Sequence, residues 1–362
     1  MGLVEKLVLP DKGRIIVISD IHANMPYFLA LLEKISFSSK DRLIIAGDFL
    51  EKGENSLETL RFIMSMSEQG FCHTICGNCD DWHLIFDPSW TYRDDEHTLR
   101  YILSKKSGLL WDMCNSCGMD LFELESFAEA KQIIREQFSR EFAFLEKLPY
   151  AIETEHYIFT HAGMFPDKPL EQHSRKELNR CDALLKKDWF FDKWLIVGHW
   201  PVVLYGENVV CANPIIDREK KIISIDGGCV LKDDGQLNAL IIPHNGSFDF
   251  SFQSYDPFPV KTVMTDQKEG DKSYYIRWGD SEVKVLSRGD EFSLCRHVRT
   301  GYEMEILTKY LFNDEEFTNC NDSTDYVLPL KAGDKVSVIE ETSRGFLVKH
   351  KGTSGWYYGE LE

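Results

Sequence analysis

Long apolar runs and an excess of basic residues are both absent from this 362-residue sequence. No apolar run reaches the roughly 20 residues that a membrane-spanning helix needs. The apolar stretch Leu7 to Pro10 is too short for the core of a signal peptide. We therefore expect a protein without a membrane segment, and the cytoplasm is its expected location.

The sequence is strongly acidic, with a formal net charge of -18. This charge argues against partners bound mainly by phosphate neutralisation, such as duplex nucleic acid or an anionic membrane. A small phosphorylated substrate is still allowed, because bound metal ions can reverse the sign of the local charge. With 43% hydrophobic and 28% charged residues, the composition is that of an ordinary globular protein.

A second cysteine pair that would complete a zinc-finger pattern is also missing. The ten cysteines are expected to be reduced thiols, because disulfides rarely persist in the cytoplasm. Cys114 and Cys117 have the spacing of a redox or metal site, but without a second pair we favour unpaired loop thiols. Cys72 and Cys76 fall on a predicted buried strand and are expected in the core.

Apolar runs of strand length alternate with segments of helical periodicity in the first part of the chain. Strands are expected at 14–20, 41–48, 71–77, 150–153, 156–161, 194–199, 222–226 and 237–242, and helices at 25–35 and 56–69. Such alternation implies parallel strands in a layered α/β domain. Residues 80–146 form a long polar stretch with helical periodicity, which we expect to be an insertion that caps the domain.

Acidic, histidine and asparagine side chains follow the expected strands. They are Asp20, His22, Asp48, Asn78, His161 and His199. In α/β sheets the loops at this strand edge converge on a crevice. Imidazole and oxygen ligands suit Mn, Fe or Zn better than Ca. One carboxylate that bridges two such ions would form a pair that clamps an in-line attack on phosphorus.

The ordered motifs resemble the calcineurin-like metallophosphoesterase superfamily. They are Asp-Ile-His at 20–22, Gly-Asp-Phe-Leu-Glu-Lys-Gly at 47–53, Gly-Asn-Cys-Asp at 77–80, His-Ala-Gly at 161–163 and Gly-His at 198–199. The second motif and Ile-Asp-Gly-Gly-Cys at 225–229 are similar to the bacterial phosphoprotein phosphatase branch, which includes symmetrical diadenosine tetraphosphatases. The resemblance covers about two thirds of the chain and implies a four-layer β-sandwich flanked by helices.

The same resemblance implies a metal centre and a reaction. Two divalent ions are implied, with manganese expected and iron or zinc as alternatives. Asp20 and His22 would hold the first ion, Asp48 would bridge, and the second ion would be held by Asn78, His161 and His199. A metal-bridging hydroxide would then attack a phosphomonoester or phosphoanhydride directly, in a nucleotide or a phosphoprotein, with Asp48 and Asn78 at the reacting centre.

Three positions depart from the phosphatase pattern, and we treat all three as catalytic candidates. Cys79 replaces the histidine that acts as general acid in that branch, although small bacterial phosphodiesterases also carry Gly-Asn-Cys-Asp. Glu51 and Lys52 replace an aspartate and an arginine, and the point charge of a lysine is not equivalent to an arginine fork. A weaker acid favours phosphoanhydrides, whose leaving group needs little protonation.

The final part of the sequence is rich in short strands and turns. We expect a catalytic domain at 1–247, a β-rich connection at 248–300 and a third domain at 301–362. Ala-Gly-Asp at 332–334 and Gly-Trp-Tyr at 355–357 make that domain resemble a bacterial SH3-like domain, a small β-barrel. Its aromatic residues could bind a peptide ligand, or Trp356 could be barrel core in a spacer module.

Other functions stay open on the sequence alone. The changes at Cys79 and Lys52 allow a non-catalytic binding protein on a phosphoesterase scaffold, and the Gly-Asn-Cys-Asp motif allows a phosphodiesterase. A cell-wall hydrolase or adhesin is a further alternative because of the SH3-like region. Retention of all six ligand types favours the metallophosphoesterase, a hydrolase of phosphoric ester or anhydride bonds.

Overall fold

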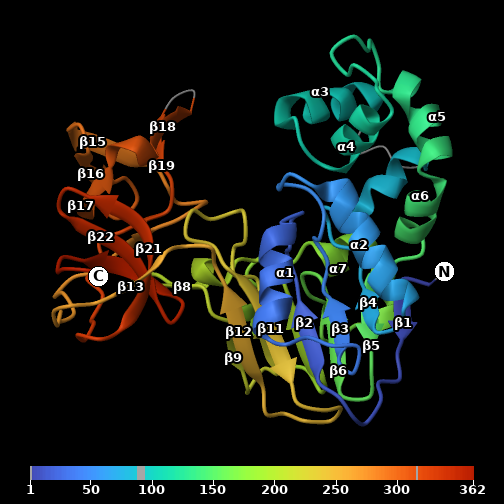
Figure 1. The fold of residues 1–362 in the computed structure, drawn as a ribbon, viewed down its shortest axis with the longest axis horizontal. Coiled ribbons are helices and arrows are strands. Elements are labelled where there is room, and N and C mark those ends of the chain that lie inside the picture. Colours follow the sequence, from blue (N-terminus) through green and yellow to red (C-terminus); the bar gives the residue numbers. More distant parts are fainter. Residues whose placement is uncertain (1, 88–93, 315–316) are drawn as a thin grey trace. The chain divides into compact units, whose positions relative to one another are not determined.

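The computed structural model describes residues 2–87, 94–314 and 317–362. The chain forms two compact units (Figure 1). Unit 1 comprises Met1–Trp200, Pro214–Leu231 and Gln236–Tyr255, and unit 2 comprises Pro201–Asn213, Lys232–Gly235 and Asp256–Glu362. Among the described residues, we find no helix with the length and apolar character needed to span a membrane.

The first sheet of unit 1 has five strands in the order β12-β11-β2-β3-β4. They are β2 (Ile15–Ile18), β3 (Arg42–Ile45), β4 (Cys72–Thr74), β11 (Leu237–Ile242) and β12 (Ser251–Tyr255). β2, β3 and β4 run parallel, as predicted, whereas β11 and β12 join the sheet antiparallel. Because β12 pairs with β11, unit 1 continues beyond residue 247, where the sequence predicted its end.

The second sheet has six strands in the order β1-β5-β6-β7-β10-β9. They are β1 (Val4–Lys6), β5 (Ala151–Glu153), β6 (Tyr157–Thr160), β7 (Trp194–Val197), β9 (Ile215–Asp217) and β10 (Ile222–Ser224). β6, β7 and β10 are parallel neighbours. All the strands predicted for the catalytic domain are therefore present.

The two sheets pack face to face through a buried apolar core. Ile15 and Val17 of β2 share this core with Phe159 of β6 and Ile196 of β7. The alternate residues of β2, such as Ile16, point to the other face of the first sheet and pack against helices. Strands covered on both faces need apolar side chains in both directions, which explains their unbroken apolar runs.

Helices cover the outer faces of both sheets. α1 (Met25–Lys34) and α2 (Ser56–Glu68) pack on the first sheet, and the Asn24 side chain caps α1 by accepting from the Tyr27 N–H at 3.4 Å. On the second sheet, a cluster includes residues of η2 (Leu170–Gln172), α7 (Arg175–Asn179) and η3 (Leu184–Lys186). Unit 1 is therefore a layered, mixed α/β structure, as expected.

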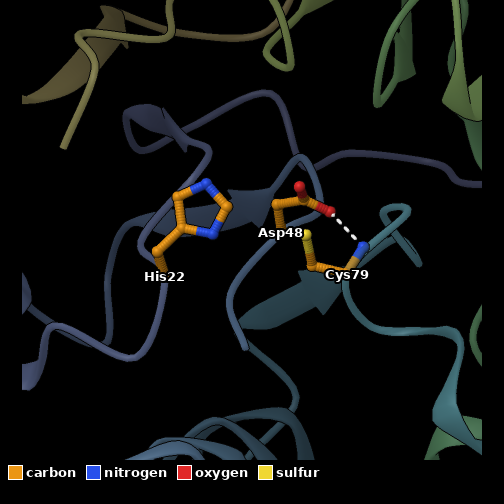
Figure 2. Close-up of side chains that lie close together, drawn as sticks. All are labelled: His22, Asp48 and Cys79. Carbon is orange, nitrogen blue, oxygen red and sulfur yellow. Dashed lines mark hydrogen bonds between the residues drawn. The ribbon is translucent and has the colours of Figure 1, made fainter. Parts of the chain in front are cut away.

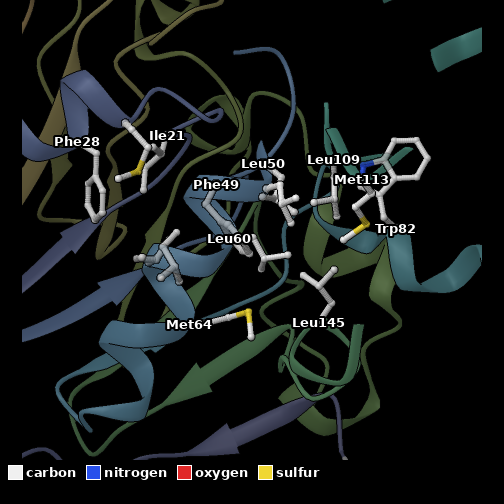
Figure 3. Close-up of a cluster of buried hydrophobic side chains, with 14 of the residues drawn as sticks. Ile21, Phe28, Phe49, Leu50, Leu60, Met64, Trp82, Leu109, Met113 and Leu145 are labelled. Carbon is white, nitrogen blue, oxygen red and sulfur yellow. The ribbon is translucent and has the colours of Figure 1, made fainter. Parts of the chain in front are cut away.

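The predicted insertion is helical. Its elements are η1 (Asp81–Phe86), α3 (Asp95–Lys105), α4 (Leu109–Ser116), α5 (Ala128–Gln137) and α6 (Ser139–Leu145). Met113 of α4 and Leu145 of α6 join Leu60 and Met64 of α2 in one buried cluster (Figure 3). The insertion thus shares its core with α2, the helix that follows the Asp48 loop.

Unit 2 consists of small sheets. The largest has the order β13-β21-β22-β23-β8, with β8 (Val210–Cys211), β13 (Val260–Thr262), β21 (Lys335–Thr342), β22 (Gly345–His350) and β23 (Thr353–Tyr357). A second sheet contains β15 (Val283–Ser287), β16 (Phe292–His297) and β17 (Glu303–Leu307). Two further pairs are β14 (Tyr275–Ile276) with β20 (Ser323–Thr324) and β18 (Leu311–Asp314) with β19 (Phe317–Cys320). Short 3-10 turns occur at η4 (Val202–Tyr205) and η5 (Thr308–Tyr310).

The expected closed SH3-like barrel is not confirmed. Within the described part of unit 2, the strands form separate sheets rather than one closed one. β8 comes from residues that precede β23 by more than a hundred positions, so its pairing with β23 could not be read from the local pattern. Trp356 is buried and its indole N–H donates to the Thr324 carbonyl at 2.7 Å.

A bidentate ion pair ties the starts of β2 and β3 together. Arg14 donates through Nε and Nη2 to the two carboxylate oxygens of Asp41, each at 2.9 Å. Burial by itself would raise the pKa of Asp41, but the hydrogen bonds from Arg14 and the Ser38 N–H outweigh it and hold the pKa below 3.8. The carboxylate form is therefore favoured in the folded state.

We expect Asp41→Asn to lower the free energy of unfolding near pH 7 by about 1–3 kcal/mol, the usual range for hydrogen bonds to a charged group. Because the folded-state pKa is depressed, this contribution is present above the ordinary pKa and is lost as pH falls through the folded value. Thermal unfolding of both proteins from pH 7 to pH 3 checks this. A stability gap that stays constant over that range would contradict it.

Candidate metal centre

The structure brings the predicted ligands together at the ends of strands from both sheets. Asp20 and His22 follow β2, Asp48 follows β3, and His161 directly follows β6. All four side chains are buried. Parallel strands end at the same edge of a sheet, so packing the two sheets face to face lets their loops meet there.

Asp48 belongs to two groups of potential ligands. In one, a carboxylate oxygen of Asp48 lies within 4.8 Å of ligand atoms of Asp20 and His161. In the other, the same limit holds for Asp48, His22 and Cys79, and Figure 2 shows these three side chains close together. One carboxylate shared by two ligand groups is the arrangement that a bridging ligand of a metal pair requires. The two groups divide the side chains differently from the predicted split, which pairs Asp20 with His22; Oδ1 of Asp20 lies 3.9 Å from Nε2 of His22.

Hydrogen bonds orient two of the imidazoles toward this centre. Nδ1 of His161 lies 3.0 Å from the Ala46 carbonyl, and Nδ1 of His22 lies 3.3 Å from the Leu50 carbonyl. A carbonyl accepts only, so each Nδ1 must carry the proton. Burial lowers the pKa of His22 to about 4, so its Nε2 keeps a lone pair, whereas Nε2 of His161 faces the Asp48 carboxylate at 3.4 Å and must give up its proton to bind an ion. Nε2 of His22 is buried without a hydrogen-bond partner, which fits a cation ligand.

Asn78 and His199 adjoin the same centre. Oδ1 of Asn78 lies 3.1 Å from Nε2 of His161. The same Nε2 of His161 lies 3.4 Å from Oδ1 of Asp48. The ring of His199 has its centroid 5.0 Å from that of His161. Nε2 of His199 lies 3.1 Å from a carboxylate oxygen of Asp182, an orienting contact that the sequence did not reveal.

Burial and neighbouring charges set the protonation of these groups. Burial lowers the pKa of His22 and of His199 to about 4, so both are neutral at pH 7, which is the form that binds metal. Burial also disfavours the charged forms of His161 and Asp48. Their mutual attraction prevails, raising the pKa of His161 to about 10 and holding the pKa of Asp48 well below its usual range.

Asp80 organises the loops that carry the ligands. Its Oδ2 accepts from the N–H of Asp48 and from the N–H of Gly77, both at 2.8 Å, and its Oδ1 accepts from the N–H of Leu50 at 3.0 Å. The side chain is fully buried. Asp80 stands in the third motif of the sequence, Gly-Asn-Cys-Asp at 77–80, but its motif position alone did not assign it this role.

Four of the six predicted ligands have left-handed backbone. The φ angles are 54° for Asp20, 49° for His22, 50° for Asp48 and 66° for His199. Each such residue costs of the order of 1–3 kcal/mol, so the surrounding contacts must hold it there. Hydrogen bonds do so, since the His22 N–H donates to the Asp48 carbonyl and the His199 N–H to a carboxylate oxygen of Asp20, both at 3.0 Å.

The predicted catalytic candidates lie in different settings. Cys79 is half-buried, its N–H donates to Oδ1 of Asp48 at 2.7 Å (Figure 2), and Nδ2 of Asn78 donates to its sulfur at 3.3 Å. Burial, followed by the charge of Asp48, raises the pKa of this thiol well above 9.0, so it keeps its proton at pH 7. Lys52 is exposed and has left-handed backbone.

Glu51 faces the helical insertion. Its Oε1 accepts from the N–H of Leu109, the first residue of α4, at 2.8 Å, and the Tyr101 hydroxyl donates to Oε2 at 3.4 Å. Gly108, the N-cap of α4, comes so close that an added Cβ would lie 2.4 Å from Oε2. The buried carboxylate therefore joins the Asp48 loop to the insertion.

Comparison with known proteins gives a family model and several relatives. The model described as calcineurin-like phosphoesterase matches residues 13–228, which contain all six predicted ligands. A symmetrical bis(5'-nucleosyl)-tetraphosphatase of Pseudomonas fluorescens is 28% identical over 183 residues, 49% of this chain and 51% of the relative. The chain thus spans about half the length of that relative.

Two further similar proteins are matched over more of their own length. The asymmetrical bis(5'-nucleosyl)-tetraphosphatase PrpE of Bacillus velezensis is 24% identical over 280 residues, 69% of this chain and 96% of that protein. A solved structure of a candidate diadenosine tetraphosphatase aligns with 71% of this chain and 100% of its own length, with 18% identity and a TM-score of 0.45.

We expect Asp80→Ala to disrupt the metal centre, because it leaves three buried N–H groups unpaired. The free energy of unfolding should fall by about 3 kcal/mol or more, and the affinity for Mn²⁺ by roughly tenfold to a hundredfold. Calorimetric titration and thermal unfolding measure the two effects. The exposed Asp188→Ala serves as control, and an Asp80→Ala protein with wild-type metal affinity would refute the organising role.

For Glu51→Ala, we expect looser docking of the insertion with retained metal. The loss of one charged acceptor should cost about 1–3 kcal/mol and speed up proteolysis within residues 94–146. Limited proteolysis and metal analysis test this, with the exposed Glu54→Ala as matched control. Loss of bound metal without faster cleavage would instead support the direct catalytic role that the sequence predicted for Glu51.

Proposed function

The chain belongs to the calcineurin-like phosphoesterase family, and on that premise we propose that unit 1 is a divalent-metal-dependent hydrolase of phosphoanhydride bonds in nucleotides. The observation that carries the proposal is Asp48, a buried carboxylate within ligand distance of two separate groups of side chains. A non-catalytic scaffold is disfavoured, because all six ligand types are retained.

The donor set fits a pair of divalent ions. Asp20 and His22 would hold the first ion, Asp48 would bridge, and the second would be held by Asn78, His161 and His199. Imidazole with carboxylate and amide oxygens suits manganese, with iron or zinc as alternatives. When bound, such a pair lowers the pKa of water and neutralises the charge that develops on the phosphoryl group.

The residues around the ions would position the reaction. Water oxygen forms a bond to phosphorus, the bridging P–O bond breaks, and the leaving phosphate departs with the electron pair. The N–H groups and carbonyls that fix Asp48, His22 and His161 keep the ligands in place without further rearrangement, which is the advantage of a preorganised site. Lys52, exposed in the Asp48 loop, would add a point charge for the substrate.

The state of Cys79 supports an anhydride substrate. An alcohol or a serine side chain leaves from phosphorus as a strong base and needs a proton, whereas a phosphate leaves as a weak base. Cys79 stands where related phosphatases have an imidazole, and a thiol is less suited than an imidazole to donate a proton at neutral pH. A poor proton donor limits phosphomonoesters more than it limits phosphoanhydrides.

The relatives support the same substrate class. Both curated relatives described above carry the name bis(5'-nucleosyl)-tetraphosphatase. A phosphoprotein is the second candidate, because the motifs at 47–53 and 225–229 resemble the bacterial phosphoprotein phosphatase branch. Phosphodiester hydrolysis is the third, on the Gly-Asn-Cys-Asp motif.

For unit 2 we keep a peptide-binding role as a proposal. Phe292, Trp356 and Tyr358 line a cavity of about 140 Å³, and the rings of Trp356 and Tyr358 are stacked with centroids 6.4 Å apart. Tyr358 is exposed, so an extended peptide could reach it. A cytoplasmic location likewise stays a prediction of the sequence.

A substrate panel tests the proposal. Protein purified without chelator and supplied with Mn²⁺ should hydrolyse bis(5'-adenosyl) tetraphosphate and ATP faster than p-nitrophenyl phosphate, bis(p-nitrophenyl) phosphate or a phosphoserine peptide. Asp48→Asn should lower kcat by roughly a thousandfold or more, while the exposed Asp188→Asn should not. Faster turnover of the phosphopeptide or of the diester than of both nucleotides would overturn the assignment to anhydrides.

A further inference from the structure

A cavity of about 350 Å³ lies beside the metal centre in unit 1. One of the residues that line it is Asn78, which is also a candidate metal ligand. On α7 and directly after it, three cationic side chains line the same cavity, namely Arg175, Lys176 and Arg180. Its volume falls in the range typical of small-molecule sites.

The local structure fixes α7 next to the metal loops. The carbonyl of Leu178 accepts from the N–H of Ala162, the residue after His161, at 2.8 Å. At the other end of the helix, Ser174 and Glu177 form a capping box, and Lys168 donates to both carboxylate oxygens of Glu177. The backbone of α7 is therefore held at a defined position relative to His161, and from it the exposed side chains of Arg175, Lys176 and Arg180 reach the cavity.

The charge of this cavity is opposite to that of the chain. Among the described residues, Arg175, Lys176 and Arg180 make no ion pair and no side-chain hydrogen bond, and Asp81 is the single acid in the lining. Elsewhere in unit 1, Lys6 and Lys193 pair with Glu153. Three adjacent cations without a carboxylate partner, in a chain of net charge -18, favour an anionic ligand.

A buried polar group in the lining gives an independent indication of a ligand. Asn179 is only 4% exposed, yet its Oδ1 has no hydrogen-bond partner among the described residues. A buried amide oxygen without a partner is unfavourable, and a ligand hydroxyl or amine would satisfy it. The guanidinium of Arg175 lies 5.8 Å from the centre of the Tyr150 ring, a contact that restrains the side chain without using its hydrogen-bond donors.

We propose that this cavity, the α7 pocket, binds the second phosphate of a phosphoanhydride substrate, the one next to the phosphate that is hydrolysed. Asn78 connects the pocket to the metal centre, the three cations bind phosphate oxygens, and Asn179 accepts from a hydroxyl of the nucleotide. The proposal rests on the proposed function, because it assumes that the first phosphate sits at the metal centre.

Binding of a non-hydrolysable probe tests the pocket separately from catalysis. Imidodiphosphate has two phosphates joined by nitrogen, and orthophosphate has one. With Mn²⁺ present, calorimetry should give the wild-type protein a Kd for imidodiphosphate about tenfold or more below that for orthophosphate. The double variant Arg175→Ala/Arg180→Ala should lose most of this difference, whereas Lys147→Ala, which removes an exposed cation outside the pocket, should keep it.

Kinetics supply the second measurement. The double variant should raise KM for ATP about tenfold while changing kcat less than threefold, since the cations act on the phosphate that does not react. Equal loss of orthophosphate and imidodiphosphate binding, or no loss of either, would overturn the pocket assignment. Should the wild-type protein bind imidodiphosphate selectively and yet hydrolyse no phosphate compound, the proposed function would fail while the pocket stands.

A conservative variant separates charge from packing. Lys176→Gln keeps most of the side-chain volume and removes the charge, and circular dichroism confirms that the protein is folded. We expect an intermediate loss of imidodiphosphate affinity for this variant, of a few-fold, and a smaller loss at high salt in every variant. If both Lys176→Gln and the double variant bound imidodiphosphate with wild-type affinity, the proposed role of the cations would be wrong.

Discussion

The buried carboxylate of Asp80 is the contact on which the metal centre depends. Its two oxygens accept three backbone N–H bonds, from Asp48, Leu50 and Gly77. These bonds join the loop after β3 to the loop after β4, and they hold Asp48 in a left-handed conformation that it would not adopt alone. The bridging role that we propose for Asp48 depends on this arrangement.

At two glycines, the backbone comes very close to carboxylates of the candidate metal centre. A Cβ at Gly77 would lie 2.2 Å from Oδ1 of Asp48, and a Cβ at Gly198 would lie 2.1 Å from Oδ2 of Asp20. Only a residue without a side chain lets the backbone come so near these carboxylates. The β4 loop supplies the first glycine and the β7 loop the second, so each sheet contributes one close contact to the same small site.

The sequence could indicate that the proposed metal ligands lie near one another, because each follows an apolar strand and forms part of a short ordered motif. Contacts between segments that are distant in the sequence could not be predicted. Glu51 lies within a predicted motif, but its bond to the Leu109 N–H depends on how the insertion packs on α2. The α7 pocket combines Asn78 with Arg175 and Arg180, about a hundred positions away in sequence. In unit 2, alternating short strands indicated β structure but not which strands pair, so the barrel expectation is not confirmed.

The central claim is that Asp48 bridges two ions, and anomalous scattering from crystals of the Mn²⁺-loaded protein tests it most directly. The account predicts two peaks about 3.5–4 Å apart on either side of Asp48, one near His22 and the other near His161 and Asn78. A single peak that Asp48 does not contact, or ions bound only elsewhere in the molecule, would contradict it.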